Sequence, residues 1–265
     1  MYITTVDRPF GLSSYLGQAV AQQIDWCQRR QAIAAAARAE EARWTAPNGQ
    51  KILESHASRL PVLRSYWEAV PVANAAFSAA RSAADDEDFP WSAAFICFVM
   101  RTAGILPADG FVFGQKHISF IVGALRNRER SDRTRPFWLV DATELQKEAT
   151  PAPGDLLCFN RCIRSNNPQH HCGGRPSRRR TTHTYSNLRA RFWGSVANQN
   201  RIATGSSHTA IVVGTVEQGG QRFVETIGGN EENSVRVTRF PIDQHGNIPN
   251  PQANHIFGMI KIVGC

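Results

Sequence analysis

The apolar run that follows Pro90 constrains this sequence more than any other part of it. The residues from Trp91 to Met100 read WSAAFICFVM and are nearly all apolar, and Gly104 and Pro107 close the run. A helix that is hydrophobic on nearly every side has to be buried, because water would otherwise contact apolar side chains all round it. We therefore expect a helix that starts near Trp91 to lie at the centre of the fold.

Periodic patterns elsewhere place helices before strands. Helical spacing of apolar residues appears on both sides of the central run, at residues 16–44, 58–70 and 117–125. β-type runs begin only after Pro153, at residues 156–159, 208–214, 222–227, 234–240 and 255–263. Residues 217–220 join the second and third runs and read Glu-Gln-Gly-Gly, which is typical of a hairpin turn. Helices followed by strands predict an α+β fold with a small antiparallel sheet, not the alternating α/β class.

The length of 265 residues fits either one domain with elaborations or two domains, since a single core grows to about 250–300 residues before a chain divides. We divide the sequence into an N-terminal helical region, residues 1–84, and a second domain, residues 85–265, which contains the central helix and the strands. An insertion at residues 161–207 separates the first two of these strands.

The net positive charge of the chain comes entirely from that insertion. It holds nine Arg and no Lys, Asp or Glu, a formal charge of +9, whereas the whole chain carries +8 and the remainder therefore −1. A solvated loop explains such a stretch without any function, because charged, Ser- and Asn-rich segments cannot bury themselves. Contact with an acidic polymer, either peptidoglycan or nucleic acid, is the other interpretation.

Several classes of protein do not fit this sequence. No apolar run approaches the roughly 18–20 residues that span a bilayer, so no membrane span is expected. The N-terminus has neither the basic nor the apolar region of a secretory signal peptide, which fits synthesis in a reducing cytoplasm. Six Cys in 265 residues are too sparse for a disulfide scaffold.

Ser92 stands near the first turn of the predicted central helix. Helix capping explains a Ser at this place without catalysis, because Ser is a favoured N-cap. The other interpretation is chemical. A hydroxyl at a helix N-terminus sits where the helix dipole favours developing negative charge, and the free N–H groups there can stabilise an oxyanion.

His208 begins the strongest predicted strand, where it is either a buried structural residue or the base of a site. If the hairpin turn centres on residues 218 and 219, His208 lies opposite Gly229 or Asn230, and Glu225 faces the region of Val212. A catalytic His needs a neighbour that holds its ring in one tautomer. Asn230 is the first candidate for that role and Glu225 the second.

Four blocks in this order resemble the NlpC/CHAP-type group of papain-fold cell-wall hydrolases: residues 90–105 (beginning PWSAAF), 153–157 (PGDLL), 207–213 (SHTAIVV) and 227–230 (IGGN). In that group the start of the central helix supplies the nucleophile, and a His on a later strand is the base. The resemblance thus implies a papain-like fold with Ser92 at the nucleophile position, His208 as general base and Asn230 or Glu225 as its orienting partner. It implies no metal and no organic cofactor.

The sequence departs from this group at the nucleophile, where the group carries Cys. A thiol is partly ionised near neutral pH, whereas the Ser92 hydroxyl must lose its proton during attack. Three interpretations follow: a serine-using hydrolase, a hydrolase whose nucleophile lies elsewhere, or a site that binds without cleaving. The nearest thiol, Cys97, lies about 140° away from Ser92 around the helix and is expected to pack in the core.

The N-terminal part, including Tyr66-Trp67, also resembles an uncharacterised bacterial subfamily of this group in which Trp-Ser-Ala-Ala-Phe is the usual form. His117 falls where that subfamily carries a His before a helix. Two interpretations fit His117 equally: a residue that reaches the site from the loop after the central helix, or a surface or helix-capping His without function.

The insertion and its edges also carry residue types that bind zinc: Cys158, Cys162, His170, His171, Cys172 and His183. The short Cys-x-x-Cys repeats that make such sites recognisable are absent. A solvated loop is therefore the preferred interpretation, and no metal site is predicted.

The function that the resemblance implies is peptidoglycan hydrolysis, by an endopeptidase or amidase that cleaves amide bonds of cell-wall peptides. Without a signal peptide, such an enzyme needs another export route. One hypothesis is an antibacterial effector that a type VI system delivers into the periplasm of a target bacterium, with an immunity protein as partner. The alternative is a catalytically inactive papain-like module that binds peptidoglycan or nucleic acid through the Arg-rich insertion.

Overall fold

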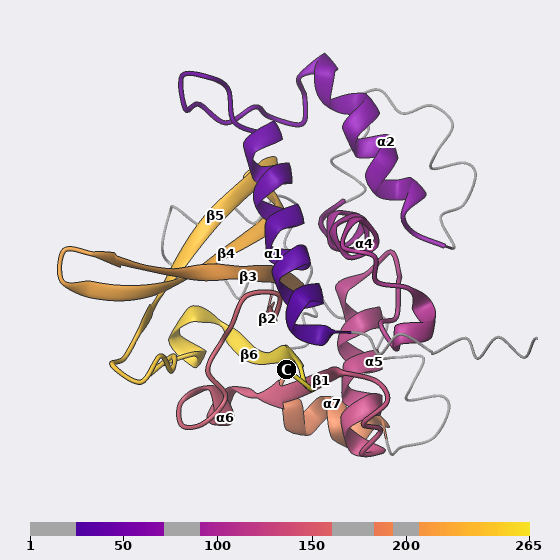
Figure 1. The fold of residues 1–265 in the computed structure, drawn as a ribbon, viewed down its shortest axis with the longest axis vertical. Helices are drawn as coiled ribbons and strands as arrows, with labels where there is room; N and C mark the ends of the chain where they lie inside the picture. Colours follow the sequence, from indigo (N-terminus) through magenta and orange to yellow (C-terminus); the bar gives the residue numbers. More distant parts are fainter. Residues whose placement is uncertain (1–24, 72–90, 161–182, 193–206) are drawn as a thin grey trace, which may run out of the picture.

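The fold is α+β, as predicted, with a six-stranded sheet in which all neighbours run antiparallel. The computed structural model describes residues 25–71, 91–160, 183–192 and 207–265. The sheet order is β1-β6-β2-β3-β4-β5 (Figure 1). The strands are β1 (Phe137–Asp141), β2 (Leu156–Asn160), β3 (Ser207–Gln218), β4 (Gln221–Glu231), β5 (Ser234–Ile242) and β6 (Ile256–Ile262).

Five of these strands agree closely with the sequence patterns, and β1 was not predicted. β1 is a run of five residues that follows a charged loop and pairs with β6 at the edge of the sheet. Its partner strand lies more than a hundred residues later in the chain, so no turn motif in the nearby sequence indicates the pairing. The position of β1 is decided by this long-range contact, which periodicity alone does not reveal.

The helices surround the predicted central one. α4 (Ser92–Thr102) is buried along almost its entire length and contacts α1, α2, β3 and β4. The others are α1 (Trp26–Arg43), α2 (Leu60–Glu68), α5 (His117–Glu129), α6 (Ala142–Leu145) and α7 (Tyr185–Phe192), with short 3-10 turns at η1 (Ala57–Arg59), η3 (Pro107–Asp109) and η4 (Gln252–Asn254). None of these described helices is both long and apolar enough to cross a membrane.

The two faces of the sheet bury different clusters. On β2, Leu156 and Cys158 join the cluster under the helices, whereas Leu157 joins a smaller cluster on the opposite face, as the two-residue period of a strand requires. The larger cluster unites residues of α1, such as Ile33, with α4 and the sheet. The N-terminal helical region is therefore packed into the same core as the strands, and α1 crosses β3 in Figure 1.

Part of the basic insertion is helical. α7 lies within it and packs on α5, with Tyr185 donating a hydrogen bond to Glu129 at 3.0 Å and Arg189 pairing with the same carboxylate at 2.8 Å. The composition predicts a solvated loop, but this part of the insertion forms a helix that packs on α5. Glu129 of α5 supplies a negative charge for Arg189, which the insertion itself lacks. Residues 161–182 and 193–206, with most of the Arg, lie outside the described residues.

A buried carboxylate joins α1 to the sheet. Asp155 pairs with Arg30 and Lys261 at 3.1 Å each and accepts the backbone N–H groups of Ala152 and Ile262 at 3.0 Å. Burial raises the pKa of the Asp155 carboxyl, and the positive charges of Lys261 and Arg30 oppose that rise. Gly154 precedes it with φ +90°, and a Cβ there would meet the Arg30 backbone at 2.8 Å, so the predicted Pro-Gly-Asp turn needs glycine for this close approach.

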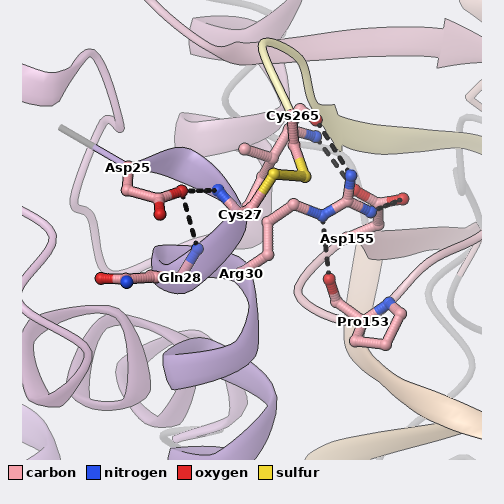
Figure 2. Close-up of a disulfide and its surroundings, with 8 residues drawn as sticks. Asp25, Cys27, Gln28, Arg30, Pro153, Asp155 and Cys265 are labelled. Carbon is pink, nitrogen blue, oxygen red and sulfur yellow. Dashed lines mark hydrogen bonds and ion pairs between the residues drawn. A yellow bond between two sulfur atoms is a disulfide. The ribbon is translucent and has the colours of Figure 1, made fainter. Parts of the chain in front are cut away.

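A disulfide fastens the same region. Cys27, in the first turn of α1, is bonded to Cys265, so α1 is tied covalently to the segment that follows β6 (Figure 2). The sequence contains too few Cys for a disulfide scaffold, yet this one bond closes a sequence separation of 238 residues. Cys97 and Cys158 are both buried free thiols.

We expect loss of this disulfide to lower the stability of the protein substantially. The Cys27→Ser/Cys265→Ser variant should lose about 2–5 kcal/mol in the free energy of unfolding, because a long loop in the unfolded chain is no longer closed. Urea denaturation followed by tryptophan fluorescence measures the change. A reducing agent should destabilise the wild type but leave the double variant unaffected; equal effects on both would contradict a stabilising disulfide.

Candidate functional site

Ser92 is the first residue of α4 and is 1% exposed. The N-cap of this helix is Trp91, so the capping interpretation of Ser92 is wrong. Instead, Ser92 Oγ lies 2.7 Å from Nε2 of His117, the first residue of α5. The first turns of two helices thus bring a hydroxyl and an imidazole into hydrogen-bond contact.

His117 makes a second hydrogen bond at the other end of its ring. Its Nδ1 lies 2.8 Å from Oγ1 of Thr209 in β3, and both side chains are buried. A hydroxyl that accepts the Nδ1 proton leaves Nε2 as the acceptor for the Ser92 hydroxyl. Ser92, His117 and Thr209 therefore form a continuous chain of hydrogen bonds, which we call the serine chain.

His208 lies beside this chain, and the imidazole that the structure brings to Ser92 is that of His117. Its ring centroid is 4.9 Å from that of His117, with the two rings nearly perpendicular. His208 Nε2 lies 3.1 Å from Oε1 of Glu231, the last residue of β4, and Thr238 donates a hydrogen bond to the other carboxylate oxygen at 2.9 Å. A His–carboxylate pair thus adjoins the serine chain.

The predicted orienting residues occupy different places. Glu225 is not brought to His208: it pairs across the strands with Gly214, beyond an irregularity in the register, and binds Arg38 and Arg239. Asn230 lies close to the expected position, next to Glu231, in the left-handed backbone region with φ 56°. The carboxylate that contacts His208 belongs to Glu231, which follows the expected position by one residue.

Two glycines make this crowded arrangement possible. A Cβ at Gly229 would lie 2.6 Å from the Phe95 side chain of α4, and a Cβ at Gly228 would overlap the Glu231 carboxylate and approach His208 Nε2 to 3.0 Å. Real side chains do not tolerate such distances, so the Gly-Gly pair lets α4 and the His208–Glu231 pair lie directly against β4.

Cys97 does not offer an alternative nucleophile. It is fully buried, its thiol donates to the Gly114 carbonyl at 3.5 Å, and burial raises its pKa to about 11. A thiol with this pKa is un-ionised at neutral pH, and the thiolate is the reactive form. Its core position agrees with the prediction from the helical wheel.

No group of His, Cys, Asp and Glu that could hold a metal ion occurs among the described residues. Two of the insertion's candidate ligands are described: Cys158 is buried within β2, and the ring of His183 packs near Phe257. Cys162, His170, His171 and Cys172 lie outside the described residues.

Thr209 and Glu231 are the site residues that the sequence reasoning missed. For Thr209 a signal was present, because alternate residues of a strand face the same side. Thr209 shares a face with Ile211 and Val213, which pack in the cluster under the helices, so its hydroxyl points from the strand toward His117 of α5. For Glu231 there was no such signal, since the expected hairpin register placed Gly229 or Asn230 opposite His208.

The arrangement has the parts needed for acyl transfer. A nucleophile requires a base within hydrogen-bond reach and a third group that orients the base, and the serine chain supplies all three. The first N–H groups of α4 have no partner within the helix and carry its positive dipole end, beside the hydroxyl on which negative charge would develop.

The chain belongs to a bacterial family without an assigned activity. A family model described as "Uncharacterized protein conserved in bacteria (DUF2272)" matches residues 63–260, which is more than half of the sequence. No curated protein and no solved structure matches the chain. The family match covers α4, His117, Thr209, His208 and Glu231, and it excludes α1.

We expect His117 to carry its proton on Nδ1, because Thr209 then accepts that proton and Nε2 is left to accept from Ser92. Nitrogen-15 NMR of the His side chains distinguishes the two tautomers directly. Thr209→Val should remove the preference, whereas Thr238→Val, which removes a hydroxyl from the neighbouring pair, should leave His117 unchanged. A proton found on Nε2 in the wild type would contradict a role for His117 as base.

Proposed function

We propose that this member of the DUF2272 family is a hydrolase that cleaves amide bonds with Ser92 as its nucleophile. The observation that carries the proposal is the serine chain, in which His117 Nε2 lies 2.7 Å from Ser92 Oγ and His117 Nδ1 lies 2.8 Å from Thr209. This differs from the assignment by family resemblance in two respects: His117 and not His208 is the base, and Thr209 and not Asn230 or Glu225 orients it.

The serine chain defines the proton movements of the reaction. Ser92 Oγ attacks the amide carbonyl while its proton passes to His117 Nε2, and the N–H groups at the start of α4 stabilise the oxyanion. His117 then gives the proton to the leaving amine as the C–N bond breaks, which leaves an ester on Ser92. Water hydrolyses this ester with His117 again as base, and the free hydroxyl is restored.

The His208–Glu231 pair supports this reaction through charge. The two imidazole rings are in contact, and positive charge appears on His117 when it accepts the Ser92 proton. Thr209 orients His117 but carries no negative charge, whereas the Glu231 carboxylate binds His208, whose ring packs against that of His117. We therefore expect His208→Ala to impair the reaction less than His117→Ala does.

The proposed substrate is the peptide of bacterial peptidoglycan, cleaved as by an endopeptidase or amidase. Its support is the resemblance to NlpC/CHAP-type hydrolases together with the order of elements, in which a buried helix carries the nucleophile position and packs on a later antiparallel sheet. A papain-like fold is part of this proposal.

The site of action that we propose is the periplasm of a target bacterium. The Cys27–Cys265 disulfide supports it, since disulfides persist in oxidising compartments, of which the bacterial periplasm is one. Delivery by a type VI system and neutralisation by an immunity protein are the corresponding proposals for export and partner.

The second candidate function is a papain-like module that binds peptidoglycan or nucleic acid without cleaving it. The burial of Ser92 and His117, which are 1% and 5% exposed, favours this alternative, because a nucleophile must meet its substrate. In that case the serine chain is a buried polar network that stabilises the junction of α4, α5 and β3.

Purified sacculi distinguish the two functions. We expect the wild type to release new free amines, and Ser92→Ala and His117→Ala each to lower the rate by about 10³-fold or more, with no further loss in the double variant because the two residues act as a unit. Ser92→Cys should retain measurable activity, since a thiol beside His117 is ionised readily.

The matched control is His245→Ala, which removes an exposed His from the loop after β5 and should leave the rate unchanged. If Ser92→Ala releases as much product as the wild type, the assignment of Ser92 as the nucleophile is refuted. Retention of the wild type on sacculi or DNA that is weakened by salt, without any product, would establish the binding module instead.

A further inference from the structure

Trp91 fixes the point at which α4 begins. It is the N-cap of the helix, it is fully buried, and its carbonyl accepts the Phe95 N–H at 2.9 Å. It immediately precedes Ser92, so any movement of Trp91 changes the position of the nucleophile. No side-chain hydrogen bond caps this helix end, which leaves the packing of the indole to hold it in place.

The indole is held by residues of the N-terminal helical region. Trp44, at the end of α1, stacks on it with ring centroids 4.9 Å apart and an angle of 17°. The indole N–H donates a hydrogen bond to the carboxylate of Glu54. Both partners lie before residue 63, where the match to the family model begins.

Glu54 is itself fixed by the sheet. It is 5% exposed, and its backbone N–H donates to the carbonyl of Asn233 at 2.8 Å, while Ser234 donates through its hydroxyl to the carbonyl of Ile52 at 2.9 Å. The segment around Glu54 is thus tied to the turn between β4 and β5. That turn directly follows Glu231, the partner of His208.

We propose that Glu54 is a positioning residue for Ser92, acting through the indole of Trp91. This inference rests on the proposed function, because positioning has meaning only for a reacting hydroxyl. It extends the working unit beyond the family match: residues 44–54 hold the start of α4, and the same β4–β5 turn holds both Glu54 and Glu231. The nucleophile and the His208–Glu231 pair therefore share one anchoring point.

The chemistry of Glu54 favours positioning over simple packing. A carboxylate is costly to bury beside a neutral donor, and an apolar side chain would fill the same space at lower cost. A hydrogen bond to a charged acceptor is roughly twice as strong as a neutral one and is directional. The advantage of a carboxylate at this place is that it fixes the orientation of Trp91, the residue that directly precedes Ser92.

The test compares Glu54→Ala, Glu54→Gln and Trp91→Phe in the full chain. A fluorophosphonate probe that phosphonylates activated Ser hydroxyls gives one readout, the rate of Ser92 labelling as a function of probe concentration. We expect Glu54→Ala to lower the maximal rate by about 10- to 100-fold with an unchanged half-saturating concentration, because Glu54 orients the nucleophile and does not contact the probe.

Two features separate positioning from general destabilisation. Glu54→Gln keeps an acceptor for the indole and should recover most of the rate. Trp91→Phe removes the donor and should match Glu54→Ala, and the double variant should lose no more than either single one. Glu129→Ala is the matched control: the Glu129 side chain is 9% exposed, and its carboxylate binds Tyr185 and Arg189 and so joins α5 to α7, so Ser92 labelling of the folded protein should be unchanged.

Hydrogen exchange at the amides of residues 92–95 gives a readout that needs no activity. Glu54→Ala should accelerate exchange there by at least about tenfold and leave α5 unaffected. A wild type that the probe does not label would refute the proposed function, and hydrogen exchange would still decide whether Glu54 holds α4. Normal labelling and exchange in Glu54→Ala, or additive losses in the double variant, would overturn the inference.

Discussion

The carboxylate of Asp155 joins three segments that lie far apart in the sequence. Through Arg30 it holds α1, and through Lys261 and the Ile262 N–H it holds the last strand of the sheet, while Asp155 itself opens β2. Each partner satisfies part of a charge that would be costly to bury alone. The disulfide between Cys27 and Cys265 closes the same junction covalently. Because α1 is fixed here, Trp44 at its far end reaches Trp91, and the position of the proposed nucleophile depends on contacts made at both ends of one helix.

Close approach of backbones is the second constraint. α4 lies directly on β4 only because Gly229 leaves room for Phe95, and α1 reaches the start of β2 only because Gly154 leaves room for Arg30. Both glycines stand in the blocks by which the sequence resembles cell-wall hydrolases. Their presence is explained by packing alone, so these blocks carry information about architecture as much as about chemistry. The case for catalysis therefore depends on side chains that packing does not require, above all the hydroxyl of Ser92 and the imidazole of His117.

Local patterns predicted most of the fold and only part of the site. The buried helix, the hairpin of β3 and β4 and the strands β5 and β6 follow from periodicity and turn residues, because those signals lie within a few positions of one another. β1 and the contact between Ser92 and His117 depend on pairings between distant segments, and no local pattern encodes such distances. His208 was predicted to be the base from its place at the start of a strand and from the family resemblance. Because side chains alternate along the strand, Thr209 is the residue that faces the helices. The register expected from the turn placed His208 opposite Gly229 or Asn230 and did not predict its contact with Glu231.

In the proposed mechanism, two groups share the tasks that a single carboxylate performs in a serine triad. In such a triad the acid both orients the imidazole and stabilises its positive charge. Here Thr209 can do only the first, since a hydroxyl is neutral. Glu231 can contribute to the second, because it binds His208, whose ring packs against that of His117. A negative charge one ring away stabilises the imidazolium less than one in direct contact, and the attraction is stronger in a buried site than in water. We therefore expect an enzyme in which the His117 ring is strictly oriented but its positive charge is only moderately stabilised. In such an enzyme the position of Ser92 at the start of α4 matters more for the rate than it would in a site with a charged orienting group.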